Sequence, residues 1–170
     1  MTSTVIPAEL GTDVAELYRH ALRNVAAAVA IVTAFDAGGA PHGTTVSAFT
    51  PLSMDPALLL VSLDNASRLL TLIKPGTPVG VNVLASSHAD IGRRFAERGA
   101  DRWRGLVWQA EAGAPALKDR HAFIGVETHQ LIAAGDHTLV VGAVREADWE
   151  PGTPLLYWQR GFGTYRSVET

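Results

Sequence analysis

The stretch that decides the fold runs from His42 to Arg68 and reads HGTTVSAFTPLSMDPALLLVSLDNASR. Its first part, residues 43–50, carries small hydroxyl side chains on a segment with strand propensity. A turn bounded by prolines follows, and residues 58–63 form a continuous apolar strand. The stretch ends in a small polar loop that opens a short helix. Backbone N–H groups and hydroxyls above a floor of strands suit a flat ligand with polar edges and a phosphate tail.

The rest of the chain predicts a few helices and many short strands. Helices are expected over residues 14–24 after an N-cap at Asp13, from Asn65 or Ser67 to Ile73, and over 88–98 after a capping-box pattern of Ser87 and Asp90. Further strands are expected near 28–35, 79–84, 107–110, 122–132, 138–147 and 155–158, with turns at 36–41, 133–136 and 160–163. This pattern predicts a mainly β protein, an antiparallel barrel with peripheral helices.

The composition of the 170-residue chain is more apolar than a solvated monomer needs, with 47% hydrophobic and 18% charged residues. We expect one domain over residues 12–170, a flexible N-terminal arm at 1–11, and a homodimer that hides part of the surface. A net charge of −3 argues against nucleic-acid binding. The sequence has neither a signal peptide nor an apolar run of about 18 residues, so we expect a cytoplasmic protein that does not enter a membrane.

The chemistry of the chain is not carried by a familiar catalytic motif. There is no cysteine, and the six histidines show none of the spacings typical of a metal site. No nucleophile elbow, phosphate-binding P-loop or glycine-rich dinucleotide fingerprint is present. If the chain is an enzyme, a bound cofactor therefore carries out the reaction.

Two features suggest where such a cofactor binds, and each has an ordinary structural interpretation. The hydroxyls of Thr44, Thr45, Ser47 and Ser53 offer a cofactor edge, or they simply reflect strand propensity and a solvated face. The expected helix start at Ser67, with Arg68 beside it, offers a phosphate site, or it is a capped helix with a surface arginine. The arginines of residues 93–104 likewise suit either a phosphate or a solvated helix face.

Several segments in their order resemble the flavin reductase components of two-component flavin monooxygenases, which have the FMN-binding split-barrel fold. The segments are VAIVTA (29–34), HGTTVSAFTPLSMDP (42–56), LLVSLDNAS (59–67), VNVL (81–84), Phe95-Ala96, Asp101-Arg102-Trp103, Gly135-Asp136-His137 and PLLY (154–157). The resemblance implies a six-stranded antiparallel split barrel with a few helices, assembled as a homodimer.

The resemblance also implies roles for individual residues. His137 of the Gly-Asp-His motif would lie beside the nicotinamide of NADH or NADPH, and Tyr157 would help to close that site. Together with the hydroxyl-rich stretch, the expected residues that bind FMN or FAD are Thr44, Thr45, Val46, Ser47, Ala48, Ser53, Ser62, Leu63, Asp64, Ser67, Asn82, Ser86, Arg102 and Tyr157.

The expected activity is that of an NAD(P)H:flavin oxidoreductase. A hydride would pass from NAD(P)H to FMN or FAD, and the reduced flavin would reach a partner monooxygenase. Three alternatives stay open at this point. The chain could be a non-catalytic flavin-binding module, an oxidase of the pyridoxamine-phosphate type, or a structural barrel without a ligand.

Overall fold

The computed structural model describes residues 12–97, 99 and 101–168, so the expected arm at 1–11 lies outside the described part. Its main element is a seven-stranded antiparallel sheet. In sheet order the strands are β3 (Pro41–Val46), β2 (Ala30–Phe35), β6 (Pro78–Val83), β9 (Ala122–Ala134), β10 (His137–Trp149), β5 (Ala57–Asp64) and β4 (Phe49–Met54).

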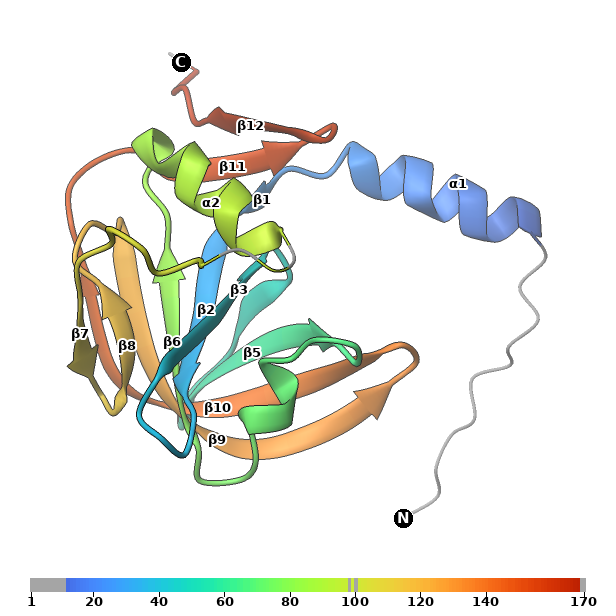
Figure 1. Ribbon diagram of the computed structural model, residues 1–170. Coiled ribbons are helices and arrows are strands. Elements are labelled where there is room, and N and C mark those ends of the chain that lie inside the picture. Colours follow the sequence, from blue (N-terminus) through green and yellow to red (C-terminus); the bar gives the residue numbers. More distant parts are fainter. Residues whose placement is uncertain (1–11, 98, 100, 169–170) are drawn as a thin grey trace.

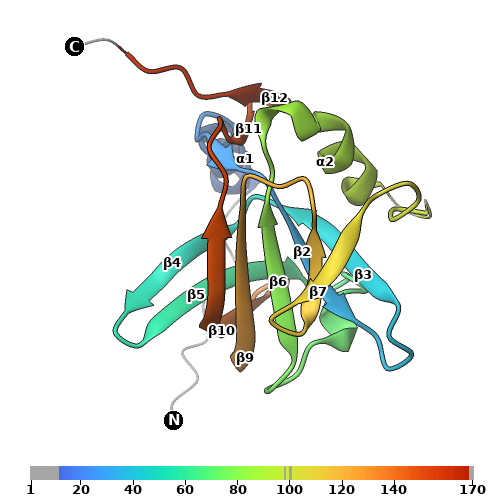
Figure 2. The same cartoon turned by 90° about the vertical axis from the view of Figure 1, so that its left-hand side faces the viewer.

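The two edge strands of this sheet, β3 and β4, are neighbours in the chain. Only Ser47 and Ala48 separate the end of β3 from the start of β4, so these ends of the two edge strands lie together and the sheet must curl into a barrel. The amide of Ser62 on β5 donates to the carbonyl of Ala48 at 2.8 Å, which extends the β4–β5 pairing into this link. The strands wrap around one interior, as Figures 1 and 2 show. The predicted split-barrel fold class is confirmed.

The number of strands differs from the expectation because residues 43–50 are not one strand. They form the end of β3 and the start of β4, on opposite edges of the sheet. The long β9–β10 hairpin confirms the one predicted, and Gly135 in its turn has a φ of 65°. A left-handed backbone at this position favours glycine over every other residue.

Two smaller sheets flank the barrel. One contains β1 (Ala27–Ala28), β11 (Leu155–Trp158) and β12 (Gly161–Thr164), and the other is the hairpin of β7 (Trp108–Glu111) and β8 (Ala114–Leu117). The prediction of a turn over 160–163 is wrong, because the turn lies at Gln159 and Arg160, whose φ values are 48° and 65°. Residues 161–164 instead pair with β11.

The helices agree only partly with the predictions. The N-terminal helix α1 (Thr12–Arg23) is confirmed, but the predicted N-cap is wrong because Asp13 lies inside the first turn. The helix α2 is confined to Ala89–Ala96 and follows a 3₁₀ turn at Ser86–His88. The predicted capping box is wrong, since the N-cap of α2 is His88 and no side chain caps it. The predicted end of this helix at residue 98 lies outside the described residues.

The helix predicted from residue 65 or 67 to residue 73 is also wrong. Only a short 3₁₀ helix forms there, at Leu70–Leu72. The α-helix does not form because local turns compete with it. The Asp64 carboxylate accepts a hydrogen bond from the Ala66 amide at 2.7 Å, and the Ser67 amide donates to the Asp64 carbonyl at 2.8 Å. Such turns withdraw the groups that would start an α-helix.

The core has two parts, because β2 is buried on both faces. One face, with Val32 and Ala34, points into the barrel. The other, with Val29 and Ile31, lies beneath Phe95 of α2. A Cβ on Gly43 of β3 would come within 2.8 Å of the Phe95 ring, so glycine lets α2 approach the edge of the barrel closely. This approach places the segment after α2 beside β3.

Candidate functional site

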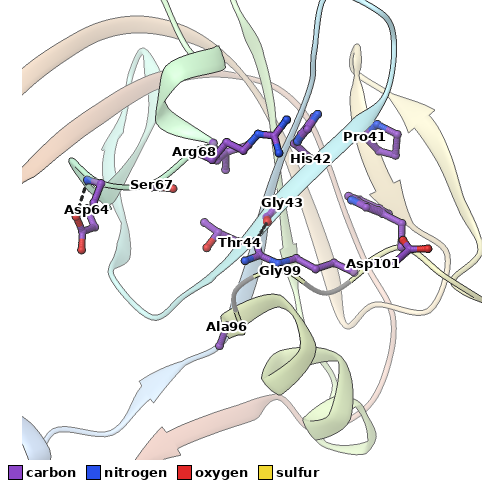
Figure 3. Close-up of a pocket in the computed structure, with 14 residues that line it drawn as sticks. Pro41, His42, Gly43, Thr44, Asp64, Ser67, Arg68, Ala96, Gly99 and Asp101 are labelled. Atoms are coloured by element: carbon purple, nitrogen blue, oxygen red, sulfur yellow. Dashed lines mark hydrogen bonds between the residues drawn. The ribbon is translucent and has the colours of Figure 1, made fainter.

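A cavity of about 730 Å³ lies where the barrel is split. Three segments surround it: the start of β3, the turns that follow β5, and the chain after α2 (Figure 3). Its lining consists of Pro41, His42, Gly43, Thr44, Asp64, Ala66, Ser67, Arg68, Leu69, Ala96, Gly99, Asp101, Arg102 and Trp103. A volume of this size is typical of small-molecule and cofactor sites, which run to about 300–1,000 Å³.

One side of the cavity carries positive charge. The side chains of Arg68 and His42 lie close together there, from the turns after β5 and from β3 (Figure 3). Within the described part of the chain, no group accepts a hydrogen bond from the exposed Arg68 guanidinium. His42 Nε2 lies 2.9 Å from Asp36 Oδ2, and this hydrogen bond holds the pKa of Asp36 below its usual range. Arg68 is therefore free to bind an anion that enters the cavity.

The floor of the cavity is held by Arg102. Its Nη1 donates to the Gly43 carbonyl on the free edge of β3 at 2.7 Å, and its Nε donates to the Glu97 carbonyl at 3.1 Å. Arg102 thus lines the cavity, as predicted, but its guanidinium ties α2 to β3. Trp103 beside it packs edge-on against Phe95, with ring centroids 5.1 Å apart. These contacts give the cavity a stiff wall.

The segment from Asp64 to Ser67 forms the opposite wall. Asp64 and Ser67 both line the cavity, as predicted. Because the segment is a set of turns, the expected phosphate site at a helix N-terminus does not exist. The side chains of Arg68, His42 and Ser67 still line the cavity and can bind an anion there.

His137 lies next to this wall. It is the direct cross-strand neighbour of Asp64, in the register of β10 on β5. Its Nδ1 lies 2.7 Å from Asp136 Oδ1, and this hydrogen bond lowers the pKa of Asp136. His137 does not itself line the cavity. Its imidazole is half-exposed, on the strand next to the cavity-lining Asp64.

Asn65 fixes the turn that carries His137. Its backbone N–H donates to the Asp136 carbonyl at 3.0 Å, and its side-chain Nδ2 donates to the Gly135 carbonyl at 3.3 Å. Its Oδ1 accepts a hydrogen bond from the Thr138 hydroxyl at 2.8 Å. The β9–β10 turn is therefore anchored to the same segment that forms the cavity wall.

The hydroxyl-rich stretch is only partly directed at the cavity. Thr44 lines it, but the Thr45 hydroxyl donates to the Gly92 carbonyl of α2 at 2.7 Å. Ser47 and Ala48 form the link between β3 and β4, and the amide of Ser62 bonds to the carbonyl of Ala48. The side chains of Val46 and Leu63 pack with the barrel core. None of these five residues lines the cavity.

Four predicted residues lie away from the cavity. Ser53 pairs with Leu58, six residues along β5 from Asp64 and so about 20 Å away. Ser86 bonds to Thr153, in the segment just before β11. Tyr157 lines a second, smaller cavity. Asn82 is fully buried in the core.

The side chain of Asn82 is engaged at both ends. Its Oδ1 accepts from the Leu117 amide at 2.7 Å, and its Nδ2 donates to the Ile31 carbonyl at 3.1 Å. A side chain that is buried and hydrogen-bonded in this way stabilises the core, and Asn82 does not line the cavity. The position of Asn82 therefore does not support its predicted role in cofactor binding.

Of the fourteen lining residues only Thr44, Asp64, Ser67 and Arg102 were predicted from the sequence. His42 and Trp103 are among those that were missed, and Arg68 was considered only as a cation beside Ser67. His42 directly precedes the hydroxyl-rich strand, and that position is the one signal that could have indicated it. Trp103 reaches the cavity through packing against α2, which no local pattern reveals.

Nowhere in the described ranges does a cluster of three or more His, Cys, Asp or Glu side chains suit a metal ion. No described helix is both long and apolar enough to cross a membrane.

Comparisons with known proteins agree on the nature of the chain. A family model described as the flavin reductase like domain matches residues 22–166. The chain is 36% identical over 154 residues to the actinorhodin polyketide dimerase of Streptomyces coelicolor, covering 89% of this chain and 87% of the relative. It is also 36% identical over 140 residues to the flavin reductase (NADPH) of Lentzea aerocolonigenes, covering 81% and 82%.

A solved structure supports the same relationship. Nitrilotriacetate monooxygenase component B from Mycobacterium thermoresistibile superimposes with a TM-score of 0.85 at 26% identity, covering 91% of this chain and 88% of that one. The family resemblance stated from the sequence is therefore confirmed. Since the family model spans most of the chain and relatives match along most of their own length, this chain belongs to the flavin reductase like domain family.

Proposed function

We propose that this protein is the reductase component of a two-component monooxygenase, which reduces FMN or FAD with NAD(P)H and passes the reduced flavin to a separate oxygenase. The observation that carries the proposal is the cavity at the split of the barrel, with Arg68 and His42 on one side and His137 on the strand next to its wall. The structural neighbour that is a monooxygenase component supports the partner.

The broader assignment does not depend on the partner. The predicted enzyme class, a flavin oxidoreductase that uses a nicotinamide nucleotide and a flavin, is confirmed by the family and by the NADPH-dependent relative. The net reaction converts NAD(P)H and oxidised flavin into NAD(P)⁺ and reduced flavin. Delivery to an oxygenase requires that the flavin can leave, and the exposure of Asp64 and Arg68 supports an open site.

The cavity fits a flavin in size and in the placement of its charges. A bound flavin supplies the electron-accepting chemistry that the side chains of this chain lack. Arg68, His42 and Ser67 would bind the phosphate, and Thr44 would offer its hydroxyl to the ring. Arg102 and Trp103 keep the wall in place. Orientation of this kind lowers the barrier because it replaces a chance encounter by a held geometry.

His137 would position the nicotinamide. Asp136 holds Nδ1, which leaves Nε2 for a molecule bound beside the cavity. The turn is anchored by Asn65, so the imidazole and the cavity wall keep a constant relation. Nε2 can also hold a proton near the site where charge develops on the reduced ring.

A homodimer in the cytoplasm completes the proposal. Met54 and Trp149 are large apolar side chains exposed on the main sheet, and among the described residues no strand pairs with the outer edge of β3 or of β4. Such a surface favours association with a second copy. Sedimentation velocity of the purified protein distinguishes the dimer from a monomer.

The reductase activity is tested by following NADH and NADPH oxidation at the nicotinamide absorbance band with FMN, FAD and riboflavin in parallel. We expect consumption of the nucleotide that depends on added flavin. Adding reaction product anaerobically to a flavin-dependent oxygenase then tests delivery. Absence of consumption with every flavin would reject the reductase, whereas consumption with no transfer would reject only the partner.

The role of His137 predicts a selective effect. His137→Ala should lower kcat by about ten- to a hundredfold while the flavin Kd changes little, because the side chain does not line the cavity. Stopped-flow reduction and flavin fluorescence titration separate the two quantities. His129→Ala, at an exposed position on β9, is the matched control. An unchanged reduction rate would remove His137 from the mechanism.

A further inference from the structure

One residue, Asn65, joins the cavity wall to the turn that carries His137. It lies between Asp64 and Ala66, which both line the cavity, but Asn65 itself does not. Its exposed side chain bonds instead to the β9–β10 turn. A displacement of this wall is therefore passed to the turn through the side chain of Asn65.

The contacts of Asn65 lie on both sides of His137 in the chain. Before His137, the Gly135 carbonyl accepts from Nδ2 at 3.3 Å, and the Asp136 carbonyl accepts from the backbone N–H at 3.0 Å. After it, the Thr138 hydroxyl donates to Oδ1 at 2.8 Å. The imidazole has a second tie, because its Nδ1 lies 2.7 Å from Asp136 Oδ1. The backbone around His137 is thus held by Asn65 and the ring by Asp136.

The amide of Asn65 suits this arrangement because it carries a donor and an acceptor on one short side chain. A carboxylate at the same place would face the Gly135 carbonyl with a second acceptor. Both side-chain bonds are exposed to solvent, so water can replace them with little loss of stability. Water does not supply a fixed distance between His137 and the cavity wall. The main effect of the two bonds therefore falls on the placement of the imidazole.

We propose that Asn65 is a positioning residue for flavin reduction, which keeps His137 in register with the cavity wall and so orients the nicotinamide. The inference rests on the proposed function for the role of His137. It requires no contact between Asn65 and either ligand. The effect is expected in the rate and not in flavin affinity, because a misplacement of about 1 Å can lower a rate by about a hundredfold.

Asn65→Ala removes both side-chain bonds and keeps the backbone bond to Asp136. We expect the single-turnover rate of flavin reduction at saturating nucleotide to fall by about five- to twentyfold, with the KM for flavin within about twofold of the original. Thr138→Val removes only the bond to Oδ1 and should give a smaller fall. Asn24→Ala, whose Nδ2 bonds to the His20 carbonyl on α1, is the matched control and should keep the original rate. A raised KM with an unchanged rate would overturn the inference, because Asn65 would then act on the wall alone.

A comparison in two backgrounds separates positioning from a general loss of structure. If Asn65 acts through His137, Asn65→Ala should slow the residual reaction of the His137→Ala protein by less than about twofold. A general structural defect would slow both backgrounds by the same factor. Equal losses in the two backgrounds, or no loss in either, would overturn the inference.

The anchoring of the turn is measured without any ligand. Amide hydrogen exchange over residues 135–138 should become at least about fivefold faster in Asn65→Ala and stay unchanged in Asn24→Ala, while the melting temperature of Asn65→Ala falls by no more than about 5 °C. Unchanged exchange at the turn would overturn the inference whatever the kinetics show. If the original protein reduces no flavin, the proposed function fails and with it the kinetic role of Asn65, whereas the exchange result still decides whether Asn65 anchors the turn.

Discussion

Arg68→Ala is expected to raise the KM for FMN by about ten- to a hundredfold, which corresponds to the loss of a charge-assisted hydrogen bond of about 1.5–3 kcal/mol. The reason is that Arg68 is the exposed guanidinium on the basic side of the larger cavity, beside His42 (Figure 3). The hydroxyl of Ser67 and the imidazole of His42 cannot replace a permanent charge. Steady-state NADH oxidation at varied FMN concentration measures the effect.

Riboflavin gives this prediction its specificity. It has the same ring as FMN but no phosphate, so Arg68→Ala should leave its KM within about twofold of the original value. Lys74→Ala removes a nearby exposed cation that does not line the cavity and serves as the matched control. Equal rises for FMN and riboflavin would show that Arg68 supports the ring or the fold, and that the phosphate lies elsewhere.

Asn82→Ala is expected to destabilise the protein by about 2–4 kcal/mol. The substitution leaves the buried amide of Leu117 without an acceptor and removes the links from β6 to β2 and to the start of β8. For a domain of this size the melting temperature should fall by about 5–15 °C. Differential scanning calorimetry measures it, with Asn24→Ala, whose side chain bonds at the exposed end of α1, as control.

The same variant tests whether Asn82 contacts the flavin. Assayed well below its melting temperature, Asn82→Ala should keep the flavin KM of the original protein, because no part of its side chain reaches the surface. A raised flavin KM with an unchanged melting temperature would restore Asn82 as a cofactor residue.

The features that the sequence predicts well are those set by local chemistry. The β9–β10 hairpin follows from two β-rich runs around a glycine turn, and Gly135 indeed takes a left-handed conformation there. The α1 helix follows from its apolar spacing. Predictions of this kind succeed because the decisive residues are close together in the chain.

The features that the sequence predicts poorly depend on competition for backbone hydrogen bonds or on contacts between residues far apart in the chain. Capping rules predict a helix that begins at Ser67. The Asp64 carboxylate instead accepts a hydrogen bond from the Ala66 amide, and a turn forms in place of the helix. Asn82 lies in a segment shared with the family, and only the fold reveals that Leu117 and Ile31 use its amide. The break within residues 43–50 likewise arises from closure of the barrel, which no short pattern encodes.

The cavity illustrates both cases. Thr44, Asp64, Ser67 and Arg102 were predicted and do line it. The role of Arg102 as a tie to the Gly43 carbonyl needs the approach of α2 to β3, which in turn needs the absence of a side chain at Gly43. Sequence alone names the residue types, whereas the fold decides which of them face the ligand.

The link of Ser47 and Ala48 has a consequence for how chains of this shape can diverge. Lengthening the polypeptide at this link would push the two sheet margins apart and displace β3, which lines the ligand site. The exposed turn that follows β2, by contrast, could gain residues at its tip around Gly38 and Gly39 without disturbing either. Insertions and deletions among descendants of this protein should therefore accumulate at such tips and spare the link.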